Sequence, residues 1–169
     1  MKTRYTYSCR SSLVTDQPRT MGFGDCEIIL LEPGGGEETV CRLWVTVPGR
    51  YSDNEALAHE VCSFVANYLT ITHDDARFLI LHETERVEID DSGESVSGPR
   101  VLGGSVPAFS SAIGRLDETT LTPEAIASFD GMGDPLSAYT DGLDAISELD
   151  KFRHFYRVIE WKFDPGKKT

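Results

Sequence analysis

His73, Asp74 and Asp75 stand consecutively, and they are the residues of this sequence best suited to proton transfer. A carboxylate beside an imidazole orients the ring, and histidine changes its protonation state near neutral pH. His82 is a second candidate base. Since no nucleophile can be identified beside either histidine, a hydrolase that uses His73 or His82 with carboxylates is kept only as an alternative hypothesis.

Other short patterns lack the full signature of a catalytic or metal site. A zincin helix needs a second histidine four positions after His59, where this chain has Ser63. A nucleophile elbow needs glycine two positions after its serine, whereas Pro107 follows Ser105 in that position. The four cysteines, none of which forms a Cys-x-x-Cys pair, are Cys9, Cys26, Cys41 and Cys62. We therefore expect no catalytic residue, no metal site and no cofactor.

The overall composition narrows the class of protein. The chain has 169 residues and a formal net charge of -12. This length suits a single domain, residues 1–169, with a substantial core. An acidic chain argues against direct nucleic-acid binding, which needs clustered Lys and Arg. The sequence has no apolar run long enough for a membrane span or a signal peptide, so we expect no membrane association and a cytoplasmic location with reduced cysteines.

The end of the chain differs in charge from the rest. Residues 1–150 contain 10 basic and 26 acidic side chains, a balance of -16, whereas residues 151–169 contain 6 basic and 2 acidic ones, a balance of +4. A basic end can complement the macrodipole of its own helix or lie against the acidic body. The alternative is an intermolecular contact.

Residues 149–163 carry more apolar surface than one helix face holds. Five residues recur at intervals of three and four and form one stripe: Leu149, Phe152, Tyr156, Ile159 and Phe163. Phe155, Val158 and Trp161 lie outside this stripe, and one sheet face cannot cover both sets. Either the rest of the domain wraps the helix, or another protein surface covers one side. The residues expected at such an interface are Phe152, Arg153, Phe155, Tyr156, Arg157, Val158 and Trp161.

These residues must be positioned by a sheet whose strands the sequence pattern indicates. Period-two alternation in residues 1–10 predicts a half-buried strand. Two β-type runs within 26–48, separated by a Pro-Gly-Gly-Gly turn, predict a hairpin with Cys26 and Cys41 on facing strands. Residues 77–90 predict a strand pair or one long bent strand. Together these segments indicate a mainly antiparallel sheet of about five strands.

Helices are expected at three places. The first spans 52–70, begins at Ser52 with Glu55 in a capping box, and packs one apolar face on the sheet. That face consists of Leu57, Val61, Phe64, Val65 and Tyr68. The first of two C-terminal helices spans 122–130, with Thr122 as its N-cap, Pro123 at its first position and Gly131 as its stop. The second spans 136–163, with an interruption near Gly142. Residues 91–120 remain unassigned, and the fold class is α+β.

The functional expectation follows from these observations. We expect a non-enzymatic protein–protein interaction module that binds a protein partner, or itself, through its C-terminal helix, with 149–163 as the docking element. An acidic decoy or inhibitor of a nucleic-acid-binding protein is an alternative, in which the stretch 83–94 or 115–150 imitates phosphate charge. The hydrolase based on His73 or His82 is the other alternative.

Overall fold

A computed structural model describes residues 1–11, 13–14, 17–30, 40–73, 78–96, 99–101, 114–115 and 117–163. The strands are β1 (Lys2–Ser11), β2 (Leu13–Val14), β3 (Arg19–Phe23), β4 (Cys26–Leu30), β5 (Val40–Pro48), β6 (Phe78–Ile89), β7 (Arg100–Val101) and β8 (Gly114–Arg115). The helices are α1 (Tyr51–Thr72), the 3-10 helix η1 (Glu118–Leu121), α2 (Pro123–Ala127), α3 (Gly133–Asp144) and α4 (Glu148–Phe163).

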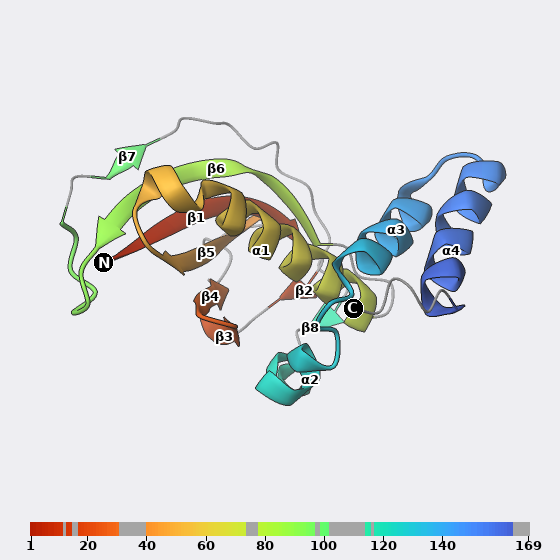
Figure 1. Ribbon diagram of the computed structural model, residues 1–169, viewed down its shortest axis with the longest axis horizontal. Coiled ribbons are helices and arrows are strands. Elements are labelled where there is room, and N and C mark those ends of the chain that lie inside the picture. The colour runs from red at the N-terminus through yellow and green to blue at the C-terminus, as the bar shows by residue number, and fades with distance from the viewer. Residues whose placement is uncertain are drawn as a thin grey trace.

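Six strands form one antiparallel sheet in the order β3-β4-β5-β1-β6-β7, and β7 contributes only two residues (Figure 1). The first helix, α1, lies along one face of this sheet, and the other helices follow at the C-terminal end of the chain. The predicted α+β class, with a mainly antiparallel sheet, a central helix and C-terminal helices, is therefore confirmed. β2 and β8 pair in parallel as a separate two-stranded sheet.

β1 is the central strand, because β5 pairs with one of its edges and β6 with the other. The alternating residues on its α1 side, among them Tyr5 and Cys9, are fully buried. The other side is also covered, contrary to the prediction of a half-buried strand. Thr6 is only 6% exposed, since it lies between the larger side chains of Trp44 on β5 and Glu85 on β6.

The hairpin predicted within residues 26–48 is confirmed by the antiparallel pairing of β4 with β5. Cys26 and Cys41 lie on these facing strands as predicted, but the register pairs Glu27 with Thr46, so the two cysteines lie at opposite ends of the pairing and are not cross-strand partners. The cross-strand partner of Cys41 is Cys9 on β1. All four thiols are free and buried.

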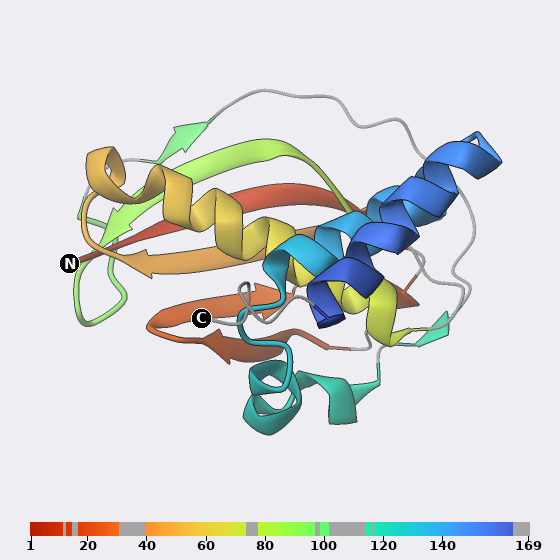
Figure 2. The same ribbon diagram turned by 45° about the vertical axis from the view of Figure 1, so that its right-hand side comes forward.

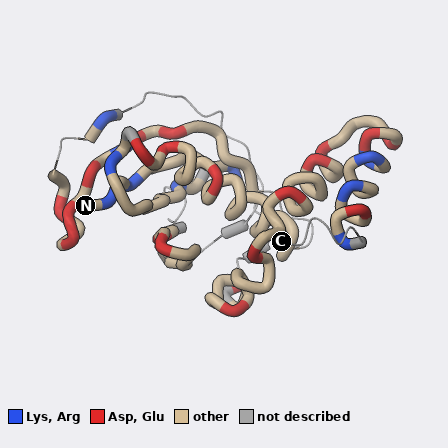
Figure 3. The backbone as a smooth tube through the Cα atoms, viewed as in Figure 1, with Lys and Arg blue, Asp and Glu red and all other residues tan. Residues whose placement is uncertain are grey.

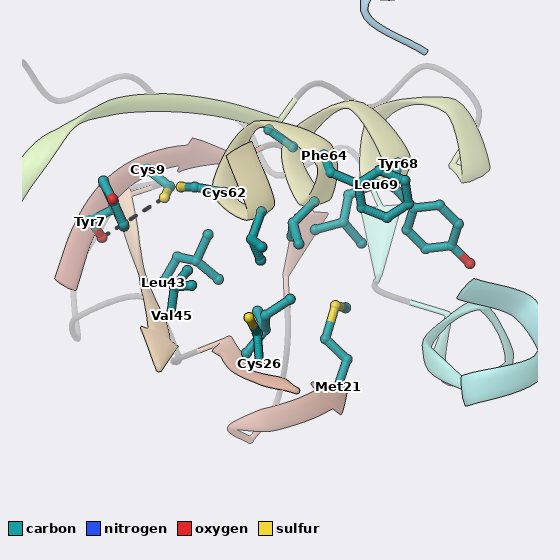
Figure 4. Packing of buried hydrophobic residues seen from close by; sticks show 14 of the residues in the cluster. Tyr7, Cys9, Met21, Cys26, Leu43, Val45, Cys62, Phe64, Tyr68 and Leu69 are labelled. Atoms are coloured by element: carbon teal, nitrogen blue, oxygen red, sulfur yellow. Dashed lines mark hydrogen bonds between the residues drawn. The ribbon is translucent and has the colours of Figure 1, made fainter. Parts of the chain in front are cut away.

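The main core lies between α1 and the sheet (Figure 4). Apolar residues recur every three or four positions along α1, so they share one face of the helix. Val61, Phe64, Val65 and Tyr68 are buried on that face as predicted. Leu57 is 39% exposed, contrary to prediction, because the neighbouring Ala58 occupies the buried position at this turn.

The start of α1 differs from the predicted capping box. The helix begins at Tyr51 after Arg50, and the N-cap makes no side-chain hydrogen bond. Glu55, expected to complete the box, instead lies 3.6 Å from the Arg86 guanidinium on β6. An ion pair with the sheet therefore takes the place of local capping.

Residues 78–89 form one long strand, which is the second of the two arrangements expected for this segment. Its register against β1 shifts twice, between Thr6 and Tyr7 and between Ser8 and Cys9. Each shift inserts an unpaired residue into β6 and bends it, which is the usual effect of a β-bulge.

The predicted helix at 122–130 is shorter than expected, since α2 ends at Ala127. Its cap is confirmed: the Ala125 amide donates to Thr122 Oγ1 at 3.2 Å, and Gly131 adopts the left-handed conformation with φ 71°. Residues 145–147 divide the predicted 136–163 helix into α3 and α4, so the interruption lies three residues beyond Gly142. The end at Phe163 is as expected.

α3 and α4 form a helical hairpin in which α3 lies between α1 and α4 (Figures 1 and 2). Leu136 of α3 is buried in the main core, and Thr140 Oγ1 donates to Asn67 Oδ1 of α1 at 2.9 Å. α4 packs chiefly against α3.

Among the described helices, none combines the length and the apolar character that a membrane span requires.

Candidate docking surface on the last helix

One side of α4 is held by α3 through a close approach of the two helices. A Cβ built on Gly142 would lie 2.6 Å from Phe155 Cε1 and 3.1 Å from His154 Cβ. The Phe155 ring also lies 5.5 Å, centroid to centroid, from that of Tyr139 on α3. Phe155, Val158 and Trp161 are each half-buried. Phe155, which lies outside the stripe, therefore forms a tertiary contact between α4 and α3.

The opposite side of α4 is open. Its large apolar residues, which we call the α4 stripe, are Leu149 (60% exposed), Phe152 (65%), Tyr156 (48%) and Ile159 (54%). The sequence pattern left open which of the two apolar sets faces the rest of the chain, and it is Phe155, outside the stripe, that packs on α3. The reason is that the partner of α4 is a helix with a glycine at the contact, not a sheet. Phe163 was predicted to extend the stripe, and its side chain lies outside the described residues.

Within the α4 stripe, the rings of Phe152 and Tyr156 stack on each other. Their centroids are 5.9 Å apart and their planes differ by 24°. Because the two residues are four positions apart, they occupy neighbouring places on one helix face. Aromatic side chains fixed in this way present a large apolar area with little conformational freedom left to lose on binding.

The predicted interface residues therefore fall into two groups. Phe152, Arg153, Tyr156 and Arg157 are exposed, and Phe155, Val158 and Trp161 are half-buried. Leu149 and Ile159 are exposed residues that the predicted set omitted. Their spacing of three positions from Phe152 and Tyr156 places them on the same helix face, so this spacing could have predicted that they belong to the interface.

The charges of α4 are distributed along its length (Figure 3). Ser147 and Asp150 form a reciprocal cap, in which the Asp150 amide donates to Ser147 Oγ at 3.1 Å and the hydroxyl donates to the carboxylate at 2.6 Å. Lys151 pairs with Glu148 at 2.8 Å, and Arg153 pairs with Asp150 at 3.3 Å. The N-terminal turn thus holds acidic residues, which suits the positive end of the helix dipole.

A shallow groove of about 430 Å³ lies between α3 and α4. Its charged lining consists of Asp134, Asp141, Glu160 and Arg157, and its apolar lining of Pro135, Ala138 and Trp161. Across the described residues, no group of three or more His, Cys, Asp or Glu side chains is arranged to hold a metal ion. The groove itself therefore combines opposite charges without a recognisable ligand set.

The two histidines of the hydrolase hypothesis occupy structural positions. His73 is the C-cap residue of α1 and is only 8% exposed. The Asp117 amide donates to its Nε2 at 3.0 Å, so the ring proton is on Nδ1, which donates to the Leu69 carbonyl oxygen at 3.0 Å. Asp74 and Asp75 lie outside the described residues. Both ring nitrogens of His73 are thus engaged with the backbone.

His82 lies on β6 opposite Ser8 of β1. Its Nε2 atom is buried and has no hydrogen-bond partner among the described residues. A general base needs a substrate proton within hydrogen-bond reach, and the groove between α3 and α4 is lined by neither histidine. The groove between α3 and α4 therefore does not bring His82 together with a substrate.

The acidic stretch 83–94 does not form one continuous anionic surface. Glu83 lies on the α1 side of β6, where Arg86 Nη2 donates to it at 2.7 Å, whereas Glu85 pairs with Thr6 on the other side. Asp90 accepts bonds from the Ser92 amide and hydroxyl at 2.8 and 2.6 Å, which lowers its pKa. Several of these acids therefore stabilise local structure.

Arg86 anchors the N-terminal end of α1 to the sheet, a role that the sequence did not reveal. Its guanidinium lies 4.1 Å from the centre of the Tyr51 ring and is bonded through two nitrogens to Glu83. Tyr5 OH donates to Asn54 Oδ1 at 2.7 Å in the same region. These side chains are buried or nearly so, and they satisfy one another. The arrangement is therefore a structural network.

Comparisons with family models, with curated proteins and with solved structures find no match to this chain.

Proposed function

We propose that this chain is a non-enzymatic binding module that docks another polypeptide through the α4 stripe. The observation that supports the proposal is the exposure of four large apolar side chains on the side of α4 turned away from α3. Contiguous exposed apolar surface of this kind is uncommon on monomers and is typical of interaction sites. A helix that presents apolar residues at intervals of three and four is a familiar recognition element.

The residue types of this surface support the same proposal. Phe152 and Tyr156 lie in the middle of the stripe, and the exposed side chain of Arg153 lies beside it. Aromatic residues and arginine are enriched among the residues that contribute most to binding. α3 holds α4 through Phe155, which lies outside the stripe, so a partner would cover the stripe without opening the core.

The proposal is tested by placing a benzophenone amino acid at position 152 of the full chain in cells that express it. Leu57 on α1, which is 39% exposed, provides the matched control position. We expect a discrete polypeptide adduct from position 152 and none from position 57. The adduct is then identified, purified and titrated against the wild-type chain and Phe152→Asp, whose affinity should fall at least tenfold.

Two outcomes would overturn this proposal. One is the absence of any adduct at position 152. The other is a purified adduct partner that binds wild type and Phe152→Asp equally well, since the stripe would then contribute nothing to binding.

A further inference from the structure

We infer that the partner of the α4 stripe is a second copy of this chain, paired with the first through α4 in antiparallel orientation about a two-fold axis. This inference rests on the proposed function and identifies the polypeptide that covers the α4 stripe. A two-fold interface must be self-complementary, because the same surface patch faces itself. The α4 stripe meets that requirement in both spacing and charge.

The spacing of the stripe reads the same in both directions. Leu149, Phe152, Tyr156 and Ile159 are separated by three, four and three positions. When two such helices lie antiparallel and are centred between Phe152 and Tyr156, Leu149 of one copy faces Ile159 of the other. Phe152 then faces Tyr156. Every large side chain of the stripe therefore meets another one, as in the apolar seam of an antiparallel helix pair.

The charges of α4 favour the antiparallel orientation. Glu148 lies at the acidic N-terminal end and Lys162 in the basic last turn. Antiparallel pairing places Glu148 of each copy beside Lys162 of the other, at both ends of the contact, and it also opposes the two helix dipoles. Parallel pairing would instead place the two Glu148 side chains beside each other at one end and the two Lys162 side chains beside each other at the other.

Charge also explains why two acidic chains would meet at this helix. The whole chain has a net charge of -12, which makes most of its surface repel another copy. α4 is nearly neutral, with the acids Glu148, Asp150 and Glu160 and the bases Lys151, Arg153, Arg157 and Lys162. Arg153 would approach its own copy near the axis, and its existing pair with Asp150 at 3.3 Å reduces that repulsion.

The geometry of the hairpin leaves this approach open. α3 holds the Phe155 side of α4, so a second helix reaches the stripe without displacing α3. A helix of 16 residues spans about 24 Å, and two such helices make a contact at the small end of specific interfaces. The expected dimer is therefore reversible and depends on concentration.

The first test is sedimentation velocity on the full chain over a range of concentrations. We expect a monomer–dimer equilibrium, with Phe152→Asp and Ile159→Asp shifting the dissociation constant at least tenfold toward monomer. Leu57→Asp, which adds the same charge at an exposed apolar position outside α4, should leave the equilibrium unchanged. A wild-type chain that is monomeric at every concentration overturns the inference.

The second test measures the orientation. Under mild oxidation, a mixture of Phe152→Cys and Tyr156→Cys chains should form the mixed disulfide, since these positions face each other in the antiparallel pair. The four native cysteines are buried and should not compete. A preference for disulfides between two Phe152→Cys chains would indicate parallel pairing and overturn the arrangement.

The third test is a charge exchange. Glu148→Lys and Lys162→Glu should each weaken the dimer a few-fold, and the double variant should restore it, because the pair is rebuilt with opposite signs. Failure of the double variant to recover affinity overturns the proposed end contacts.

The two proposals fail in distinguishable ways. A monomeric chain that still yields an adduct with a different polypeptide at position 152 removes the second copy as the occupant and leaves the docking function intact. A monomeric chain without any adduct removes both.

Discussion

The ring of Phe155 lies directly over Gly142, so that a Cβ at position 142 would meet Cε1 at 2.6 Å and Cδ1 at 2.9 Å. Separations this short do not occur in well-packed proteins, and the two helices can approach this closely only because position 142 has no side chain. The same contact orients α4. With Phe155 turned toward α3, Phe152 and Tyr156 are turned toward solvent.

Gly142→Ala should destabilise the α3–α4 hairpin. Alanine gains about 1 kcal/mol of helix propensity over glycine, but overpacking against a ring typically costs about 1–3 kcal/mol. The His154 Cβ atom, 3.1 Å from the new methyl position, restricts the relief available to α4. We expect a net loss of stability in denaturant unfolding. Trp161 fluorescence in a Trp44→Phe background should report that α4 separates first.

Gly133→Ala is the matched control, because nothing lies within 4 Å of a Cβ at that position of α3. It should leave stability unchanged or raise it slightly. Adding Phe155→Leu to Gly142→Ala should recover part of the loss, since leucine is shorter than the ring. Equal stability of the two alanine variants would contradict the role assigned to the Gly142 contact.

Phe152→Ala and Phe155→Ala should differ strongly although both remove a phenylalanine from one helix. Phe152 is 65% exposed, so its loss at dilute, monomeric concentration should change unfolding free energy by less than about 0.5 kcal/mol. Phe155 packs on Tyr139 and Gly142, and its loss leaves a gap that should cost about 2–3 kcal/mol. Equilibrium unfolding of both variants measures the difference. The reverse order would mean that the other face of α4 is the packed one.

Local patterns were sufficient to predict much of the fold. Alternation at period two identified β1, because successive side chains of a strand point to opposite faces, and intervals of three and four identified α1, because its apolar residues share one buried face. The Thr122 cap and the left-handed conformation of Gly131 were predicted correctly, since each depends on the backbone conformation of a few neighbouring residues, although α2 already ends at Ala127. The pairing of β4 with β5 was predicted from two β-type runs that a short turn sequence separates, which is also a local pattern.

Long-range packing decided the features that the sequence did not reveal. α4 has two apolar faces, and its periodicity cannot show which of them contacts the rest of the chain. In the structure, Gly142 of α3 lies under the Phe155 ring, and this contact identifies the face of α4 that packs on the chain. Similarly, Glu55 was assigned to a local cap, whereas the long-range partner Arg86 lies 3.6 Å away on β6. The spacing of residues along the chain therefore does not show which side chains from different elements contact each other, and the structure does.

Arg86→Ala should be among the most destabilising substitutions at a charged residue. The side chains of Arg86 and Glu83 are only 11% and 14% exposed, so removal of the cation leaves a nearly buried carboxylate without its main partner. Loss of one member of a buried pair typically costs about 3–5 kcal/mol. The double variant Arg86→Leu/Glu83→Leu should unfold at a higher denaturant concentration than Arg86→Ala. If Arg86→Ala unfolds like wild type, the network does not anchor α1.

Alkaline conditions should destabilise the fold through Tyr5. Burial raises the pKa of Tyr5 to about 12, with the nearby Arg86 charge opposing the shift, whereas an unfolded tyrosine ionises near 10. The neutral phenol is also the form that donates to Asn54 Oδ1 at 2.7 Å. Because the unfolded state loses its proton first, this contribution to stability is complete below pH 10 and decreases as the pH rises from about 10 to 12. Denaturant unfolding at intervals across this range should show a shallower decline for Tyr5→Phe than for wild type, and parallel declines would indicate that Tyr5 ionises alike in both states.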